Sequence, residues 1–145
     1  MAVTAAPYDK FTLNQLTGAT KIDFDSASID ARLLVSSYTP DLAADEFWSD
    51  ISSHEVAAGG VYATGGQALA GITVTLAAHA VTVVAADPLW SASTITARYA
   101  AYVLHSGASA TDRLICLVDF GGDESTVSAD FTITIAADGF LKMAA

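Results

Sequence analysis

The stretch that decides the fold is Thr94–Gly122, TITARYAAYVLHSGASATDRLICLVDFGG. Two apolar runs, Thr94–Leu104 and Arg113–Phe120, flank a loop of small and polar residues, His105–Asp112. Both runs are rich in β-branched and aromatic residues and contain no proline, as is typical of central strands. The stretch therefore predicts a β-hairpin in the middle of an antiparallel sheet.

The register of this hairpin follows from counting outward from its loop. Antiparallel pairing places Tyr99 opposite Val118, on a face that is almost wholly apolar and is expected to meet the core. The other face is mixed and pairs Arg98 with Asp119. Isolated charge pairs are weak markers of functional sites, so we interpret this pair as a marker of register.

Other segments predict additional short strands and helices. Alternating apolar residues indicate strands at Lys21–Phe24, Ser28–Ser36, Ile72–Ala77, Ala80–Ala86, Phe131–Ala136 and Phe140–Met143. Pro7 and Gly18 bracket a short helix over residues 8–17, in which Leu16 would join the apolar stripe, and residues 43–51 suggest a helical turn or two. The glycine-rich segment Ala57–Gly71 is expected to be a surface excursion or a bulged edge.

These elements predict a mainly β fold, an antiparallel β-sandwich of seven to eight strands with one or two short helices. A closed barrel of the same strands is the alternative within this class. The length of 145 residues, without repeats or linkers, predicts a single domain over residues 1–145. The small residues at the start of the chain predict a flexible N-terminal arm over residues 1–7.

The composition of the chain limits the kinds of partner that it is expected to have. The formal net charge of −10 argues against a nucleic-acid partner, because phosphates repel such a surface. No apolar run approaches the roughly 20 residues of a membrane span, and no secretory signal is visible, so no membrane partner is expected. The single cysteine, Cys116, excludes a disulfide within the chain and any cysteine-based metal site, and it is expected to be a buried thiol.

A search for chemistry in the sequence finds none. His54, His79 and His105 fall in three separate loops or turns, without a second histidine at metal-binding spacing. We expect them to be solvated loop residues. No acid, base and nucleophile can be named together. The expectation is a protein that is not an enzyme, with no catalytic, cofactor-binding or metal-ligating residues and no cofactor.

One long segment, Ile29–Val56, carries a family resemblance. It reads IDARLLVSSYTPDLAADEFWSDISSHEV: a strand ending in a Ser-Ser-Tyr-Thr-Pro turn, an acidic Phe-Trp-Ser-Asp-Ile-Ser helix and a His-Glu-Val step. This combination resembles a family of small, largely uncharacterised virion structural proteins of tailed bacteriophages. The resemblance continues through Tyr8–Phe11, Gly65–Leu69, Trp90–Tyr99, Val118–Asp123 and Phe131–Leu141, and so spans most of the chain.

The resemblance implies a location in the virion and a non-enzymatic role there. The first expectation is a capsid decoration, or cement, protein that stabilises the head through surface contacts. The alternative is a tail, neck or fibre component with a host-surface binding role. The implied partners are other copies of the chain in a symmetric oligomer, with a trimer as the first expectation, and the major capsid protein or other virion proteins.

Overall fold

The computed structural model describes residues 2–3, 5–18 and 21–144. Strand makes up 45% of the chain and helix 12%, in open antiparallel sheets with two short helices. The predicted mainly β, sandwich-like fold is therefore confirmed. The described residues form twelve labelled strands, more than seven or eight, because several have only two or three residues.

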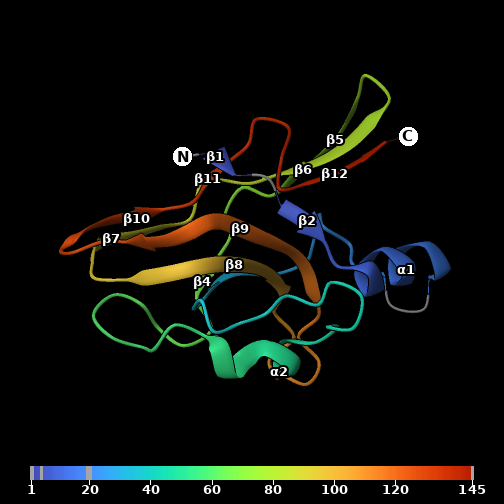
Figure 1. Ribbon diagram of the computed structural model, residues 1–145. Helices are drawn as coiled ribbons and strands as arrows, with labels where there is room; N and C mark the ends of the chain where they lie inside the picture. Colours follow the sequence, from blue (N-terminus) through green and yellow to red (C-terminus); the bar gives the residue numbers. More distant parts are fainter. Residues whose placement is uncertain (1, 4, 19–20, 145) are drawn as a thin grey trace.

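The main layer is a five-stranded sheet in the order β2-β9-β8-β3-β4 (Figure 1). Its strands are β2 (Ala5–Pro7), β3 (Ile29–Leu34), β4 (Gln67–Ala68), β8 (Thr96–Leu104) and β9 (Leu114–Ser125). The predicted hairpin supplies β8 and β9, which lie at the centre of this sheet. The short β4 belongs to the glycine-rich segment and forms one edge, as expected of a bulged surface excursion.

The second layer consists of smaller sheets that lie over the main one (Figure 1). Two of them are antiparallel: β7 (Leu89–Ser93) with β10 (Ala129–Thr132), and β5 (Thr73–Ala77), β6 (Ala80–Val84) and β12 (Leu141–Ala144) in the order β12-β6-β5. The third pairs β1 (Ala2–Val3) with β11 (Thr134–Ile135) in parallel. Aromatic contacts join the layers: the rings of Tyr102 and Phe140 lie 4.8 Å apart, and those of Phe120 and Phe131 lie 6.0 Å apart.

The helices are short and lie outside the sheets. α1 (Asp9–Thr17) ends at Gly18, whose φ of +74° is favourable only for glycine, so the predicted helix is confirmed. Its apolar stripe is narrower than expected, because Phe11 is buried whereas Leu16 is 80% exposed. The predicted helical turns near residues 43–51 are found slightly later, as α2 (Trp48–Ile51) and the 3₁₀ turn η1 (Ser52–His54).

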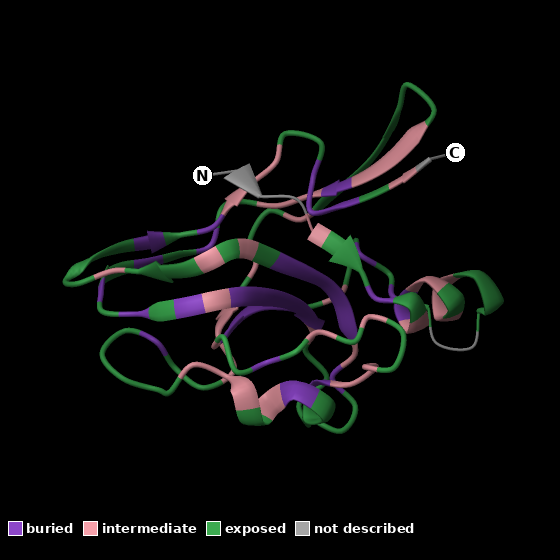
Figure 2. Ribbon diagram, viewed as in Figure 1, coloured by how far each residue is buried: buried purple, intermediate pink, exposed green. Residues whose placement is uncertain are grey.

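Both faces of the main sheet are buried at its centre, which corrects the expectation of one buried and one mixed face. Every residue of β3 is buried (Figure 2). Most residues of β8 are buried too, and so are the first five residues of β9, Leu114–Val118. The second layer covers one face. The segment that carries α2 covers the other, where the ring of Tyr38 meets that of Tyr99 at 5.6 Å.

The hairpin register was predicted correctly next to the loop and wrongly beyond it. Val103 pairs with Leu114 as expected, but Tyr102 then pairs with Cys116, so a bulge shifts the pairing by one residue as far as Asp119, and a second irregularity between Ala97 and Tyr99 shifts it further. Tyr99 therefore lies opposite Asp119 rather than Val118. The bulge is tolerated because both faces are buried, so apolar side chains suit either one.

Two segments in the N-terminal part of the chain also differ from expectation. The predicted strand at Lys21–Phe24 is absent from the described residues 21–24, although Ile22 and Phe24 are buried against the core. Part of the segment expected to be a flexible arm is ordered: β2 pairs with β9, and β1 with β11, while residues 1 and 4 lie outside the described residues. The free edge of β9 supplies backbone partners that the sequence pattern did not reveal.

Candidate functional site

Three charged side chains are buried together beneath α2. Asp30 and Arg32 come from β3, and Asp112 comes from the end of the β8–β9 loop. Their exposed fractions are 7%, 3% and 4%. Buried charges are rare unless they are paired, so this cluster is the strongest candidate site in the described part of the chain.

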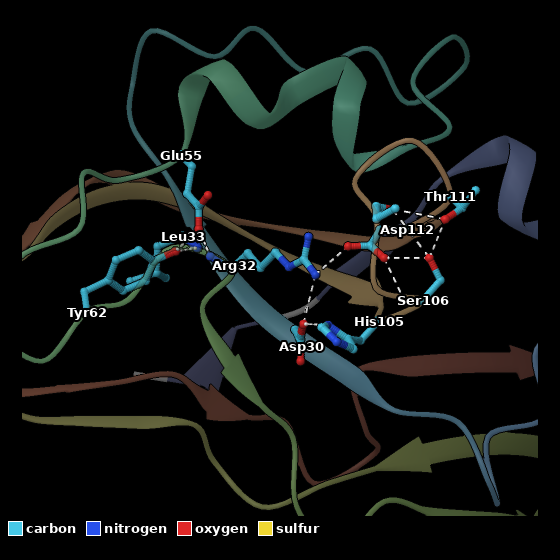
Figure 3. A network of polar contacts seen from close by, with 11 residues as sticks. Asp30, Arg32, Leu33, Glu55, Tyr62, His105, Ser106, Thr111 and Asp112 are labelled. Carbon is cyan, nitrogen blue, oxygen red and sulfur yellow. Dashed lines mark hydrogen bonds and ion pairs between the residues drawn. The ribbon is translucent and has the colours of Figure 1, made fainter.

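Arg32 is the centre of the cluster (Figure 3). Its Nη2 atom donates to Asp30 Oδ2 at 2.9 Å and to Asp112 Oδ2 at 2.7 Å. Its guanidinium carbon lies 4.9 Å from the centre of the Trp48 ring, a cation–π contact with the first residue of α2. The buried Nε atom has no hydrogen-bond partner among the described residues. Arg32 therefore joins the sheet to both α2 and the loop.

Asp112 fastens the loop at the end of the central hairpin. Its Oδ1 atom accepts hydrogen bonds from the Ser106 N–H at 2.7 Å and from the Ser106 hydroxyl at 2.8 Å. Its backbone carbonyl accepts from the Trp48 N–H at 2.8 Å, and the carbonyl of Ser109 accepts from the Ser49 N–H at 3.0 Å. The loop and α2 are thus held to each other and, through Arg32, to β3.

The three histidines lie in different surroundings. His105 Nδ1 lies 2.9 Å from Asp30 Oδ2, while its ring is 54% exposed. His54 Nδ1 lies 2.9 Å from the Ser37 hydroxyl, and His79 is exposed at the β5–β6 turn. Solvent exposure was expected for all three and is found for His79 and His105, whereas His54 is half-buried beside the Tyr38 ring. The contact of His105 with a buried carboxylate was not expected.

A second polar cluster lies on the other side of Arg32 (Figure 3). The Tyr62 hydroxyl donates to Glu55 Oε1 at 2.9 Å and accepts the Leu33 N–H at 3.0 Å. The same carboxylate oxygen accepts the Gly65 N–H at 2.7 Å. These bonds tie the glycine-rich segment to β3, so its paired glycines lie on an anchored loop.

The electrostatics of the first cluster favour the charged forms of Asp112 and Arg32. Burial alone would raise the pKa of Asp112, but the N–H and hydroxyl of Ser106 and the guanidinium of Arg32 outweigh it and hold the pKa below its ordinary value. Burial likewise works against the charge of Arg32, but its bonds to Asp30 and Asp112 outweigh that effect and raise its pKa. The cluster is a buried ion triad in which the guanidinium of Arg32 pairs with both carboxylates.

This arrangement is suited to holding the fold together. Both Asp112 oxygens and the Nη2 atom of Arg32 have partners within the chain, and burial raises the pKa of the Cys116 thiol, which keeps it protonated. Within residues 2–3, 5–18 and 21–144, no three His, Cys, Asp or Glu side chains are grouped so that they could hold a metal ion. The geometry therefore indicates a structural role. We call the cluster of Asp30, Arg32 and Asp112 the clamp, because it holds β3, α2 and the β8–β9 loop together.

The charge pair predicted from the sequence lies elsewhere, on the surface. Arg98 Nε donates to Asp119 Oδ1 at 2.9 Å, and Nη2 donates to Oδ2 at 3.3 Å. The two residues are close neighbours, as predicted, but they are not directly opposite, because Asp119 pairs with Tyr99 and Arg98 lies at a register shift. The Asp119 side chain is 52% exposed, so this pair is a surface contact.

The sequence contained a signal for the buried cluster. Asp30 and Arg32 are two residues apart in a strand and therefore share one face. In an alternating strand such as the one predicted at Ser28–Ser36, the polar face normally lies outside. Leu34, the apolar residue of β3 that shares this face with Asp30 and Arg32, is the hint that this face is covered.

The lowered pKa of Asp112 predicts how acid affects stability. The unfolded chain takes up a proton near the ordinary aspartate pKa of about 3.9, whereas the folded chain does so only at lower pH. The contribution of Asp112 is therefore complete above about pH 5, and it is lost as the pH falls through the folded pKa. Urea unfolding from pH 6 downward should show the free energy of unfolding falling in this window.

Substitution of Asp112 by asparagine tests this assignment. D112N should lower stability at neutral pH and flatten the decline in acid, because the linked proton is gone. D123N, at an exposed aspartate, is the matched control and should leave the slope unchanged. Equal acid slopes in D112N and the wild type would show that Asp112 is not responsible.

Comparisons with known proteins complete the description of the site. Among the described residues, no helix is both long enough and apolar enough to cross a membrane. No protein-family model, curated protein or solved structure matches the chain.

Proposed function

We propose that this chain is a non-enzymatic structural protein of a tailed-bacteriophage virion, and that it decorates and stabilises the capsid. The observation that carries the proposal is the combination of motifs in Ile29–Val56, together with the matching segments along most of the chain. This combination resembles that of small phage virion proteins in both content and order.

The structure supports this proposal through the role of the same segment. Ile29–Val56 supplies β3 and α2, the two elements that the Arg32 cluster joins to the central hairpin. Asp30 and Arg32 of this segment thus hold β3, α2 and the β8–β9 loop together. A protein that acts by contacting the regular array of capsid subunits needs a rigid body that holds its surface loops in place.

The mechanism we propose is assembly through many identical contacts. A copy bound at each equivalent position of a symmetric shell needs only a modest interface, because repeated contacts add by avidity. The partners are other copies of the chain in a symmetric oligomer, with a trimer at a three-fold position as the first expectation, and the major capsid protein or another virion protein. The net charge of −10 favours solubility and disfavours contact with nucleic acid.

A tail, neck or fibre role with host-surface binding is the alternative. It would use the two loops that the sequence singles out, Ala57–Gly71 and His105–Asp112. Both loops are tied down from within, the first by Glu55 and the second by Asp112. Their exposed residues are mostly glycine, alanine and serine, which seldom anchor a ligand. We therefore favour decoration over recognition.

Cryo-electron microscopy of the particle that contains this chain tests the proposal. We expect density for the β-sandwich at many equivalent positions on the outer face of the capsid. Density confined to the tail or neck would reject decoration in favour of the alternative. Absence of the chain from purified particles would contradict any role in the virion.

A further inference from the structure

The sheet formed by β5, β6 and β12 projects from the body and ends in the β5–β6 turn (Figure 1). Ala78 and His79 form this two-residue turn with φ values of +50° and +61°, as a tight hairpin requires. β5 is the outer strand, and all five of its residues are exposed. Its outward backbone groups therefore have no strand partner among the described residues.

This edge lacks the features that normally prevent one sheet from pairing with another. Edge strands are usually protected by charged residues, proline, bulges or a covering element. Residues 71–86 contain no Asp, Glu, Lys, Arg or Pro. The β5–β6 ladder runs from Thr73–Val84 to Ala77–Ala80 without a register shift. The edge is thus free of bulges, exposed and uncharged.

One face of the projecting sheet is apolar across all three strands. Val74, Val83 and Leu141 form one cross-strand row, and Leu76, Val81 and Met143 form the next. Val83 and Leu141 are buried, whereas Val74 is 39% and Leu76 is 69% exposed. The apolar surface therefore continues to the free edge and is exposed most at β5.

We propose that β5 pairs with β5 of a second copy of this chain, antiparallel and in full overlap. In this register Val74 of each copy lies beside Leu76 of the other, and Thr75 lies opposite its own counterpart. Each pairing thus covers the two exposed aliphatic side chains with each other, and aliphatic neighbours across a ladder are favourable. The result is a six-stranded sheet related by a two-fold axis.

A second copy fits this edge because its exposed row is complementary to itself, Val74 to Leu76, and because charge does not oppose the contact here. Two copies that each carry a net charge of −10 repel one another, and the repulsion is weakest where both present an uncharged surface. The segment 71–86 is such a surface. After pairing, the outer edges of the joint sheet are the β12 strands, which carry Lys142, the kind of charged residue that prevents further addition.

The proposed function includes self-association of this chain, and this inference names one contact by which it occurs. It rests on the self-association and not on the location in a virion. A two-fold contact links two copies or two trimers, because it cannot itself close a trimer. It is tested on the isolated protein, so failure of the virion proposal and failure of this pairing are distinguishable: the first is decided on particles and the second in solution.

The first test compares two leucine-to-lysine variants by sedimentation velocity over a range of micromolar concentrations. Leu76 and Leu16 are both strongly exposed, but only Leu76 lies on β5. We expect the wild type and L16K to associate through this contact, and L76K to lose it, because a lysine from each copy is placed at the junction. A monomeric wild type, or equal association of L76K and L16K, would overturn the proposal.

The second test does not depend on the folding of L76K. The chain's only cysteine, Cys116, is buried, so a cysteine introduced on the surface is the only accessible thiol. Under mild oxidation T75C should form a disulfide-linked dimer, because full overlap places the two thiols opposite each other. V127C, at a 79% exposed position away from β5, should not. Equal cross-linking of T75C and V127C would also reject this pairing.

Discussion

Replacing Arg32 by methionine is expected to lower the free energy of unfolding by about 3–5 kcal/mol, a large part of the 5–15 kcal/mol typical of a domain. Methionine keeps much of the side-chain volume but removes the guanidinium. Asp30 and Asp112 would then remain buried without their cation. The contact with Trp48 would lose its charge as well.

Urea unfolding, followed by tryptophan fluorescence, measures this loss. R98M is the matched control, because Arg98 also contacts an aspartate but does so on the surface, and its midpoint should stay close to that of the wild type. R32K should fall between R32M and the wild type, because lysine keeps the charge but lacks the planar fork. An R32M midpoint no lower than that of R98M would contradict the clamp.

Truncation of Tyr102 to alanine is the second change with a large expected effect, about 3–5 kcal/mol. Tyr102 lies on β8 with 1% exposure, and its ring packs at 4.8 Å from the ring of Phe140, which precedes β12. The contact joins the main sheet to the layer above it. Removal of the ring leaves a cavity between the two layers, which the surrounding strands cannot fill without moving.

Y102F separates the ring from the hydroxyl. It keeps the contact with Phe140, so its stability should stay near that of the wild type. Guanidinium unfolding of Y102A, Y102F and the wild type, with equal slopes, gives the comparison. A Y102A midpoint equal to that of Y102F would show that the ring does not hold the layers together.

The sequence predicted those elements whose signals are local. The apolar β-prone runs gave the central hairpin, and Gly18 marked the end of α1 because the backbone there requires a positive φ. The strands predicted at Ile72–Ala77 and Ala80–Ala86 are found as β5 and β6 for the same reason. In each case neighbouring residues alone decide the backbone conformation, so no distant contact is needed.

The bulge near Ile115 illustrates a feature that local signals could not fix. Counting from the loop gave the correct partner for Val103 and the wrong partner for Tyr99. A pattern with period two assigns one face to the core, but here both faces of the sheet are covered, so either register buries apolar side chains. The choice depends on packing against both layers.

By itself the sequence determined the fold class and the central hairpin, because residue alternation, turn residues and the lack of strong helix patterns act within a few positions. Only the tertiary structure decided that Asp30, Arg32 and Asp112 form a buried cluster. Arg32 and Asp112 are 80 positions apart, and no local pattern reports that a distant loop and α2 cover the same strand. The polar face of β3 is buried because α2 and the β8–β9 loop cover it. Its charges are therefore paired within the chain, since a buried charge without a partner is costly.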